Sequence, residues 1–264
     1  MGTVTGVSSD YAEAKIHKIR VADLRDVLRQ GMRDYASNRS DVLFLCLIYP
    51  LLMYTVVRLA FGYGVIPLIF PIVSGCALLG PVVAVGLYHV SWRREQGLET
   101  HWRDAFQVFR LPGIGSIAVL AVLLATLFMA WLAVAITLYQ STVGSGAIWF
   151  MSPGEFLAEV FGTPRGWLLI GAGNLLGLMF AGVVLSISVI SFPLLVDRDV
   201  GPVDAVLTSL RAVAANPLPM AVWGLMVSGL LLLGALPFFV GLAVAMPVLG
   251  HATWHLYRRV ITLP

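Results

Sequence analysis

Charged residues are scarce in this chain of 264 residues: only 12% are charged, 59% are hydrophobic, and the mean hydropathy is +0.89. A soluble domain of this length carries about 25% charged residues. An apolar surface of such extent is satisfied by lipid rather than by water. The composition therefore excludes an ordinary soluble globular protein.

Cysteine and catalytic signatures are also nearly absent. The two cysteines, Cys46 and Cys76, lie inside apolar runs, so neither a disulfide framework nor a zinc site is indicated. We find no phosphate-binding glycine loop, no HExxH, no GxSxG and no acidic pair within an apolar run. We therefore expect a protein that is not an enzyme.

Six apolar stretches are long enough, at about 20 residues, to cross a bilayer as helices. They are Val42–Ala60, Ile66–Val90, Gly115–Tyr139, Gly166–Val196, Leu218–Pro237 and Phe238–Val260. Prolines interrupt several of them, which predicts kinked helices. The predicted fold is all-α and polytopic, with a six-helix transmembrane domain over 42–260 after an N-terminal segment over 1–41.

The basic residues predict an orientation. Of 17 lysines and arginines, only Arg58 and Arg165 fall on one side of the predicted spans, and the rest fall on the other. The positive-inside rule places both termini in the cytoplasm. The pI of about 9.0 then reflects topology rather than nucleic-acid binding.

A charged amphipathic segment precedes each pair of spans. The three segments are "VADLRDVLRQGMRDYASNRSD" (21–41), "ETHWRDAFQVFRLPG" (99–113) and "GPVDAVLTSLRAVAANP" (201–217), and each contains Asp followed by a small apolar residue. The predicted apolar faces are Val21, Leu24, Leu28, Met32 and Tyr35; Trp102, Ala105, Phe106 and Phe109; and Val203, Val206, Leu210 and Val213. We expect three repeated units, each an amphipathic helix on the inner leaflet or docked beneath the bundle, followed by a helical hairpin.

The long outer loop, residues 140–166, contains the sequence Ser152-Pro153-Gly154-Glu155. This pattern predicts a short helix that begins with a capping box.

The histidines are the best candidates for a cofactor site. His251 and His255 are four residues apart and share a helical face, and His89 lies at the inner end of the second predicted span. If those spans adjoin, the three imidazoles meet at one depth and suit a transition metal or haem. Anchoring at the membrane boundary or hydrogen bonding between helices is the alternative, and we favour it.

Three stretches carry a family resemblance: "GLYHVSWRREQGLETHWRDA" (86–105), "SFPLLVDRDVGPVDAVLTSLRAVAANP" (191–217) and "PVLGHATWHLYRR" (247–259). They resemble a bacterial family of predicted integral membrane proteins, domain of unknown function 2189, over roughly residues 40–260. The resemblance implies six spans and a multi-pass protein of the bacterial inner membrane. It implies no activity or ligand.

Three functional hypotheses follow. The leading one is a non-enzymatic accessory, scaffold or assembly partner of membrane lipids and other inner-membrane proteins. The second is a carrier or channel for a lipid-like or small apolar solute. The third is a haem- or metal-binding accessory of a respiratory complex that uses His89, His251 and His255.

Overall fold

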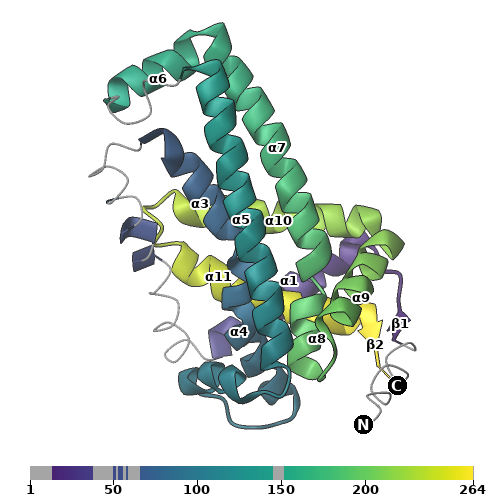
Figure 1. The fold of residues 1–264 in the computed structure, drawn as a ribbon. Coiled ribbons are helices and arrows are strands. Elements are labelled where there is room, and N and C mark those ends of the chain that lie inside the picture. The colour runs from purple at the N-terminus through teal and green to yellow at the C-terminus, as the bar shows by residue number, and fades with distance from the viewer. Residues whose placement is uncertain are drawn as a thin grey trace, which may run out of the picture.

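The computed structural model describes residues 14–37, 50–51, 53–55, 58, 66–144 and 152–263. The described chain is almost entirely helical, as the composition predicts (Figure 1). The helices are α1 (Val21–Ser37), η1 (Ile66–Leu68), α3 (Ile69–Leu78), α4 (Gly80–Glu95), η2 (Trp102–Arg110), α5 (Ile114–Thr142), α6 (Pro153–Gly162), α7 (Pro164–Ser188), α8 (Ser191–Asp197), α9 (Pro202–Ala215), α10 (Pro217–Ala235) and α11 (Leu242–Val260). Two short strands, β1 (Lys15–Ile16) and β2 (Ile261–Thr262), pair near the ends of the chain.

Four helical stretches among the described residues are long and apolar enough to cross a membrane. They are Ile69–Glu95, Ile114–Thr142, Pro164–Asp197 and Pro217–Ala235, and within an apolar segment of 18 residues in each, only 22% to 33% is buried within the protein. Their outward faces are therefore suited to lipid.

The other two predicted spans are not confirmed. Most of the predicted span 42–60, including Cys46, lies outside the described residues. The predicted sixth span corresponds to α11, which is a helix but not one of the four, because its second half carries two histidines and an arginine pair.

Proline divides two of the predicted spans, in agreement with the expected kinks. The stretch 66–90 is split into η1, α3 and α4, and Pro81 lies in the first turn of α4, where its missing N–H costs nothing. The stretch 166–196 is split into α7 and α8. Pro193 has no N–H to donate to the carbonyl of Val189, so the helical hydrogen bonding is interrupted there.

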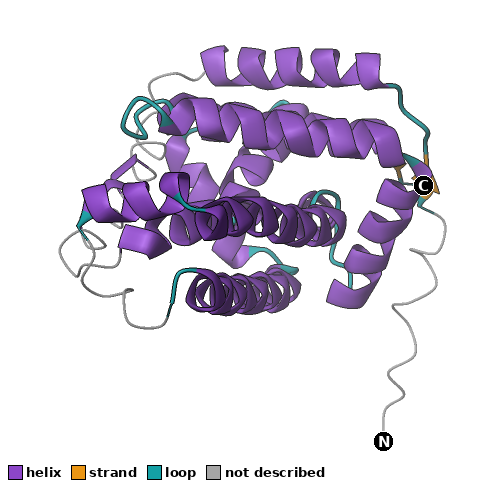
Figure 2. Cartoon of the chain, turned by 90° about the horizontal axis from the view of Figure 1, so that it is seen from above, coloured by secondary structure: helices purple, strands orange, loops and turns teal. Residues whose placement is uncertain are grey.

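Two helical hairpins cross each other in the molecule. α5 and α7 run side by side and are joined through α6, whereas α10 and α11 run across them (Figure 1). Seen from above in Figure 2, α5 and α7 are viewed end-on while other helices lie lengthwise. The predicted bundle of six similar rods is therefore not confirmed.

The centre of the protein is α11, which packs against α1, α4, α8 and α10. Most of its side chains are buried, and Trp254, Leu256 and Tyr257 are 0% exposed. α11 therefore forms the core, unlike the four outward-facing stretches.

The connection between α10 and α11 is tight, as the sequence predicts. A Cβ atom on Gly241 would lie 2.8 Å from the Cα of Gly234, so the two chains approach as only glycines allow. Phe238 and Phe239 take positive φ values of 50° and 64° in the turn. Phe238 is 87% exposed at the tip of the hairpin.

The N-terminal strand joins the two ends of the described chain. β1 pairs antiparallel with β2, so that Lys15 faces Thr262 and Ile16 faces Ile261. Buried Asn216, at the end of α9, accepts a hydrogen bond from the backbone N–H of Ile19 at 2.8 Å and donates one to the carbonyl of His17 at 3.1 Å. The segment before α1 is therefore fixed to both α9 and α11.

Candidate functional site

The amphipathic helix α1 docks directly on α11. Leu24, Val27, Gly31 and Tyr35 form its buried face. A Cβ atom on Gly31 would lie 2.5 Å from the carbonyl oxygen of Val248 in α11, so glycine permits the close approach of the two backbones.

The predicted face of α1 is correct only in part. Leu24 and Tyr35 are buried as predicted, but Val21 and Met32 are 40% and 47% exposed. The helix is rotated so that small Gly31 meets α11, because the closest backbone contact decides the interface.

A polar cluster lies where α1, α4 and α11 meet, and we define it as Asp34, Ser91, Arg94, His251 and His255. One carboxylate oxygen of Asp34 accepts a hydrogen bond from Arg94 at 2.9 Å, and the other pairs with Nε2 of His255 at 2.7 Å. The hydroxyl of Ser91 and Nδ1 of His251 share a hydrogen bond of 2.7 Å. The polar cluster thus ties α1 and α4 to the central helix.

The electrostatics of the polar cluster favour an ionised Asp34. Burial opposes ionisation, but the hydrogen bond with His255 and the positive charges of the neighbouring side chains outweigh it and lower the pKa of Asp34. The carboxylate is thus held as a fixed anion between Arg94 and His255. It is suited to binding helices together rather than to exchanging protons near neutral pH.

A second group of charges lies beside the polar cluster. Arg258 contacts Glu95 at 3.0 Å and Asp197 at 3.1 Å, and the hydroxyl of Tyr257 donates to Asp197 at 2.7 Å. These contacts join the ends of α4, α8 and α11. Arg259 adds a contact of 3.4 Å with Asp23 of α1.

The three candidate histidines have different surroundings. His251 and His255 both belong to the polar cluster and make hydrogen bonds between helices, which is the role that we favoured. His89 stacks on Trp92, with ring centroids 5.6 Å apart, and lies near Asp104 of η2. Since His89 and Ser91 lie about 200° apart around α4, His89 is directed away from the polar cluster.

Within the described ranges, no group of three or more His, Cys, Asp or Glu side chains is arranged to hold a metal ion. Binding of haem or of a transition metal by His89, His251 and His255 therefore stays a prediction. Sequence reasoning did not identify Asp34, Ser91 or Arg94, because these residues reach their partners across 60 to 221 positions of the chain.

The second amphipathic segment is η2, and its predicted face is correct for Ala105 but wrong for Phe106 and Phe109. Ala105 and Val108 are buried, whereas Phe106 and Phe109 are 48% and 69% exposed. The 3₁₀ helix has 3.0 residues per turn, so positions three apart share a face, whereas the prediction assumed 3.6. Ala105 packs beside Gly86 of α4, and Arg93 reaches Asp104 at 3.5 Å.

The third amphipathic segment, α9, buries small residues instead of large ones. Ala205, Ser209 and Ala212 face inward, while Val203 is 68% and Leu210 is 39% exposed. The hydroxyl of Ser209 donates to the carbonyl of Ser186 in α7 at 2.7 Å. The predicted apolar face is therefore correct only in part: Val206 and Val213 pack against the core, while the closest contact with α7 is made by small side chains.

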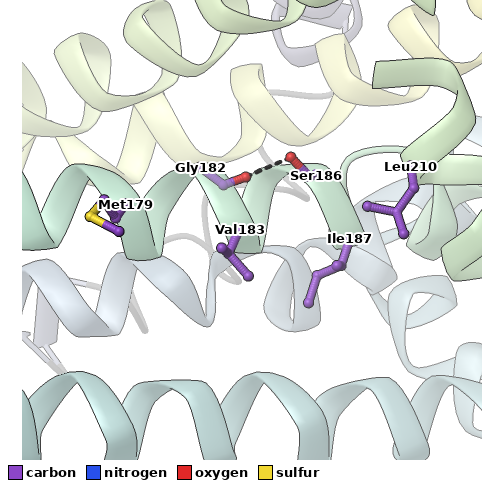
Figure 3. Close-up of a pocket in the computed structure, with 6 residues that line it drawn as sticks. All are labelled: Met179, Gly182, Val183, Ser186, Ile187 and Leu210. Carbon is purple, nitrogen blue, oxygen red and sulfur yellow. Dashed lines mark hydrogen bonds between the residues drawn. The ribbon is translucent and has the colours of Figure 1, made fainter. Parts of the chain in front are cut away.

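A shallow apolar groove of about 540 Å³ opens between α7 and α9 (Figure 3). Five of its lining residues follow α7 and one comes from α9: Met179, Gly182, Val183, Ser186, Ile187 and Leu210. The only polar side chain drawn in it, Ser186, donates to the carbonyl of Gly182 at 2.7 Å. The groove therefore offers apolar contact and no charged group.

The three amphipathic segments share one buried position. Val27, Ala105 and Ala205, which follow Asp26, Asp104 and Asp204, are 0%, 6% and 0% exposed. η2 packs on α4, α9 packs on α7 and α8, and α1 packs on α11. Each segment thus contacts the last helix of a predicted unit.

Residues 69–197 match the model of a family described as "Predicted integral membrane protein (DUF2189)". No curated protein and no solved structure matches the chain. The matched range begins at α3 and ends with α8, so it includes η2 and two residues of the second group of charges, Glu95 and Asp197. The resemblance seen in the sequence is confirmed over residues 69–197, which are similar to this family of predicted integral membrane proteins.

Proposed function

We propose that the chain is a non-enzymatic protein of the bacterial inner membrane, and that it acts as an accessory, scaffold or assembly partner of other membrane components. The observation that carries the proposal is how the polar side chains are used. Asp34, Asp197 and His251 each make contacts between helices, while many large apolar residues of α5 and α7, such as Val122 and Leu178, face outward. Such an arrangement supports a rigid body with an apolar outer surface for neighbours in the membrane.

Site-specific photo-cross-linking tests this role. A photoreactive amino acid at Leu178, which is 63% exposed on α7, is expected to give one discrete protein adduct in native membranes. The matched control is Val184 on the same helix, which is 4% exposed and is expected to give none. If outward positions on α5, α7 and α10 yield only lipid adducts, the scaffold role is wrong.

We propose six crossings, with both termini in the cytoplasm. The pairing of β1 with β2 places the two ends of the described chain together, which supports an even number of crossings. α10 and α11 form a tight hairpin, so both cross if either does. The four apolar stretches and α11 then make five crossings. An even total requires one more crossing before α3, where the predicted span 42–60 lies.

Thiol labelling in intact spheroplasts tests this topology. In a variant with both native cysteines replaced by serine, Phe238→Cys at the hairpin tip and Ser152→Cys are expected to react with a membrane-impermeant reagent. Lys18→Cys is expected to react only after lysis. A Phe238→Cys thiol that stays protected until lysis would remove the last two crossings.

We also propose that the three units arose by triplication. The shared buried position after Asp26, Asp104 and Asp204 supports this, as does the contact of each amphipathic segment with the last helix of a unit. The first segment contacts the third unit, so the three units would close into a ring. An alignment of relatives in which the Asp–small pair recurs in only one segment would contradict it.

A carrier or channel for a lipid-like or small apolar solute is our second proposal. The apolar groove between α7 and α9 supports it. Reconstituted vesicles that contain the protein would then exchange a fluorescent lipid between leaflets faster than protein-free vesicles. Equal rates would contradict a carrier.

A haem- or metal-binding accessory is the third proposal. The pair His251 and His255 on one face of α11 supports it. An absorption spectrum and elemental analysis of protein purified from native membranes would detect the cofactor, and His251→Ala would remove it.

A further inference from the structure

We propose that the groove between α7 and α9 binds one anionic phospholipid, with an acyl chain in the groove and the phosphate beside Arg211. This inference concerns a resident lipid, and it holds whether or not the chain transports a solute. It starts from the position of the groove along α7.

The groove lies near the end of a membrane-spanning helix. α7 has 25 residues and is about 37 Å long at 1.5 Å per residue, slightly more than the hydrocarbon core of a bilayer at about 30 Å. Ser186, to which α9 is hydrogen-bonded, is in the last turn of α7. α9 therefore lies at the membrane boundary, and the groove extends from it toward the membrane interior.

The shape and chemistry of the groove suit an acyl chain. From Met179 to Ile187 the lining follows α7 for about 12 Å. Gly182 leaves an open strip along this face, since a Cβ atom there would meet nothing within 4 Å. Met179 and Val183 are 61% and 51% exposed, so their apolar surface is uncovered by the protein itself.

A basic residue next to the groove suits an anionic headgroup. Arg211 follows Leu210, which lines the groove, and its side chain is exposed. Among the described residues no carboxylate forms an ion pair with Arg211, whereas Arg93, Arg94, Arg258 and Arg259 all have such partners. An uncompensated arginine at the membrane boundary attracts an anionic phosphate group.

Lipid titration followed by native mass spectrometry tests the proposal. The full chain in mild detergent is titrated with dioleoylphosphatidylglycerol or with dioleoylphosphatidylcholine, which share acyl chains but differ in net charge. We expect one phosphatidylglycerol molecule to bind about fivefold more tightly than phosphatidylcholine, the equivalent of about 1 kcal/mol for one basic residue near an anionic lipid. Equal affinities for the two lipids would overturn the proposal.

Two pairs of variants separate the groove from general binding. Gly182→Leu fills the groove and is expected to weaken the binding of both lipids at least about fivefold. Gly171→Leu, at an equally open position of α7 outside the groove, is expected to leave both affinities unchanged. Arg211→Gln is expected to remove the preference for phosphatidylglycerol, while Arg110→Gln on η2 keeps it.

Variants that unfold are recognised by circular dichroism and gel filtration, and for these a single-cysteine spin label at Leu210 replaces the titration. The label, in a chain whose two native cysteines are replaced by serine and whose groove is otherwise unchanged, is expected to lose mobility on addition of phosphatidylglycerol. Identical effects of Gly182→Leu and Gly171→Leu, or a label that does not respond, would overturn the assignment of the groove.

Discussion

The two amphipathic helices α1 and α9 dock on their partners in different ways. α1 combines a close backbone approach at Gly31 with an ion-paired carboxylate at Asp34. α9 uses small side chains and the neutral hydroxyl of Ser209, and it leaves large apolar residues exposed beside a groove. Similar amphipathic sequences therefore dock differently: the first helix completes the core, and the third leaves large apolar residues uncovered by the protein.

The difference follows from what each helix meets. α1 covers α11, which carries histidines and arginines and needs charged partners when it is buried. α9 covers the end of α7, whose neighbouring groups are apolar side chains and backbone carbonyls, so no charge is needed there. Burial of the polar end of α11 thus determines the charge pattern of α1.

The largest effect is expected from filling the α1 contact. Gly31→Leu forces side-chain atoms into Val248 and Ala252 and is expected to lower the free energy of unfolding by about 3 kcal/mol. Gly229→Leu in α10 is the control, since nothing lies within 4 Å of its Cβ position. Denaturant unfolding in mild detergent measures both, and equal stabilities would show that α1 is not docked as described.

Removal of the Asp34 carboxylate comes next. Asp34→Ala leaves Arg94 and His255 without their partner and is expected to cost about 2 kcal/mol, as lost hydrogen bonds to charged groups do. Asp26→Ala on the same helix removes a carboxylate that is 54% exposed and is expected to cost less than about 0.5 kcal/mol. If Asp26→Ala costs more stability than Asp34→Ala, the polar cluster does not hold α1.

The contribution of Asp34 to the stability of the protein depends on pH. Because the pKa of Asp34 is lowered in the folded protein, its contribution is complete above the unfolded value of about 4 and is lost as the pH falls through the folded value. Thermal unfolding between pH 7 and pH 3 is expected to show this loss in the native chain. In Asp34→Asn that part of the pH dependence should disappear, and an unchanged profile would contradict the assignment.

The smallest effect is expected at the α9 contact. Ser209→Ala removes the hydrogen bond to the Ser186 carbonyl and is expected to cost about 1 kcal/mol without changing the close packing. Thermal unfolding in the same detergent measures it. A loss as large as that of Asp34→Ala would mean that the two helices dock with similar strength.

The sequence predicted local features well. The span 115–139 corresponds to α5 at Ile114–Thr142, and the capping box of Ser152 and Glu155 forms at the start of α6. These features depend on neighbouring residues, such as a long apolar run or a side chain that bonds the backbone three positions away. Such patterns are visible in a single sequence.

The faces of the amphipathic helices could not be predicted in the same way. Phe106 and Phe109 were assigned to a buried face by the 3.6-residue period, but the 3₁₀ geometry of η2 exposes them. In α9 the larger apolar residues were expected inside, yet the contact selects Ala205 and Ala212. In a membrane, large apolar side chains also find a favourable surrounding outside the protein, so hydrophobicity alone does not identify the interior.

The antiparallel pair of β1 and β2 has a practical consequence for engineering. Because Lys15 faces Thr262, a linker of a few residues between them would give a circular polypeptide without disturbing α1 or α11. Such a chain can be reopened at Gly97, an exposed turn glycine with a φ of 72°, to make a circular permutant. Fluorescent reporters fused to the new ends would then sit next to η2 rather than beside the strand pair.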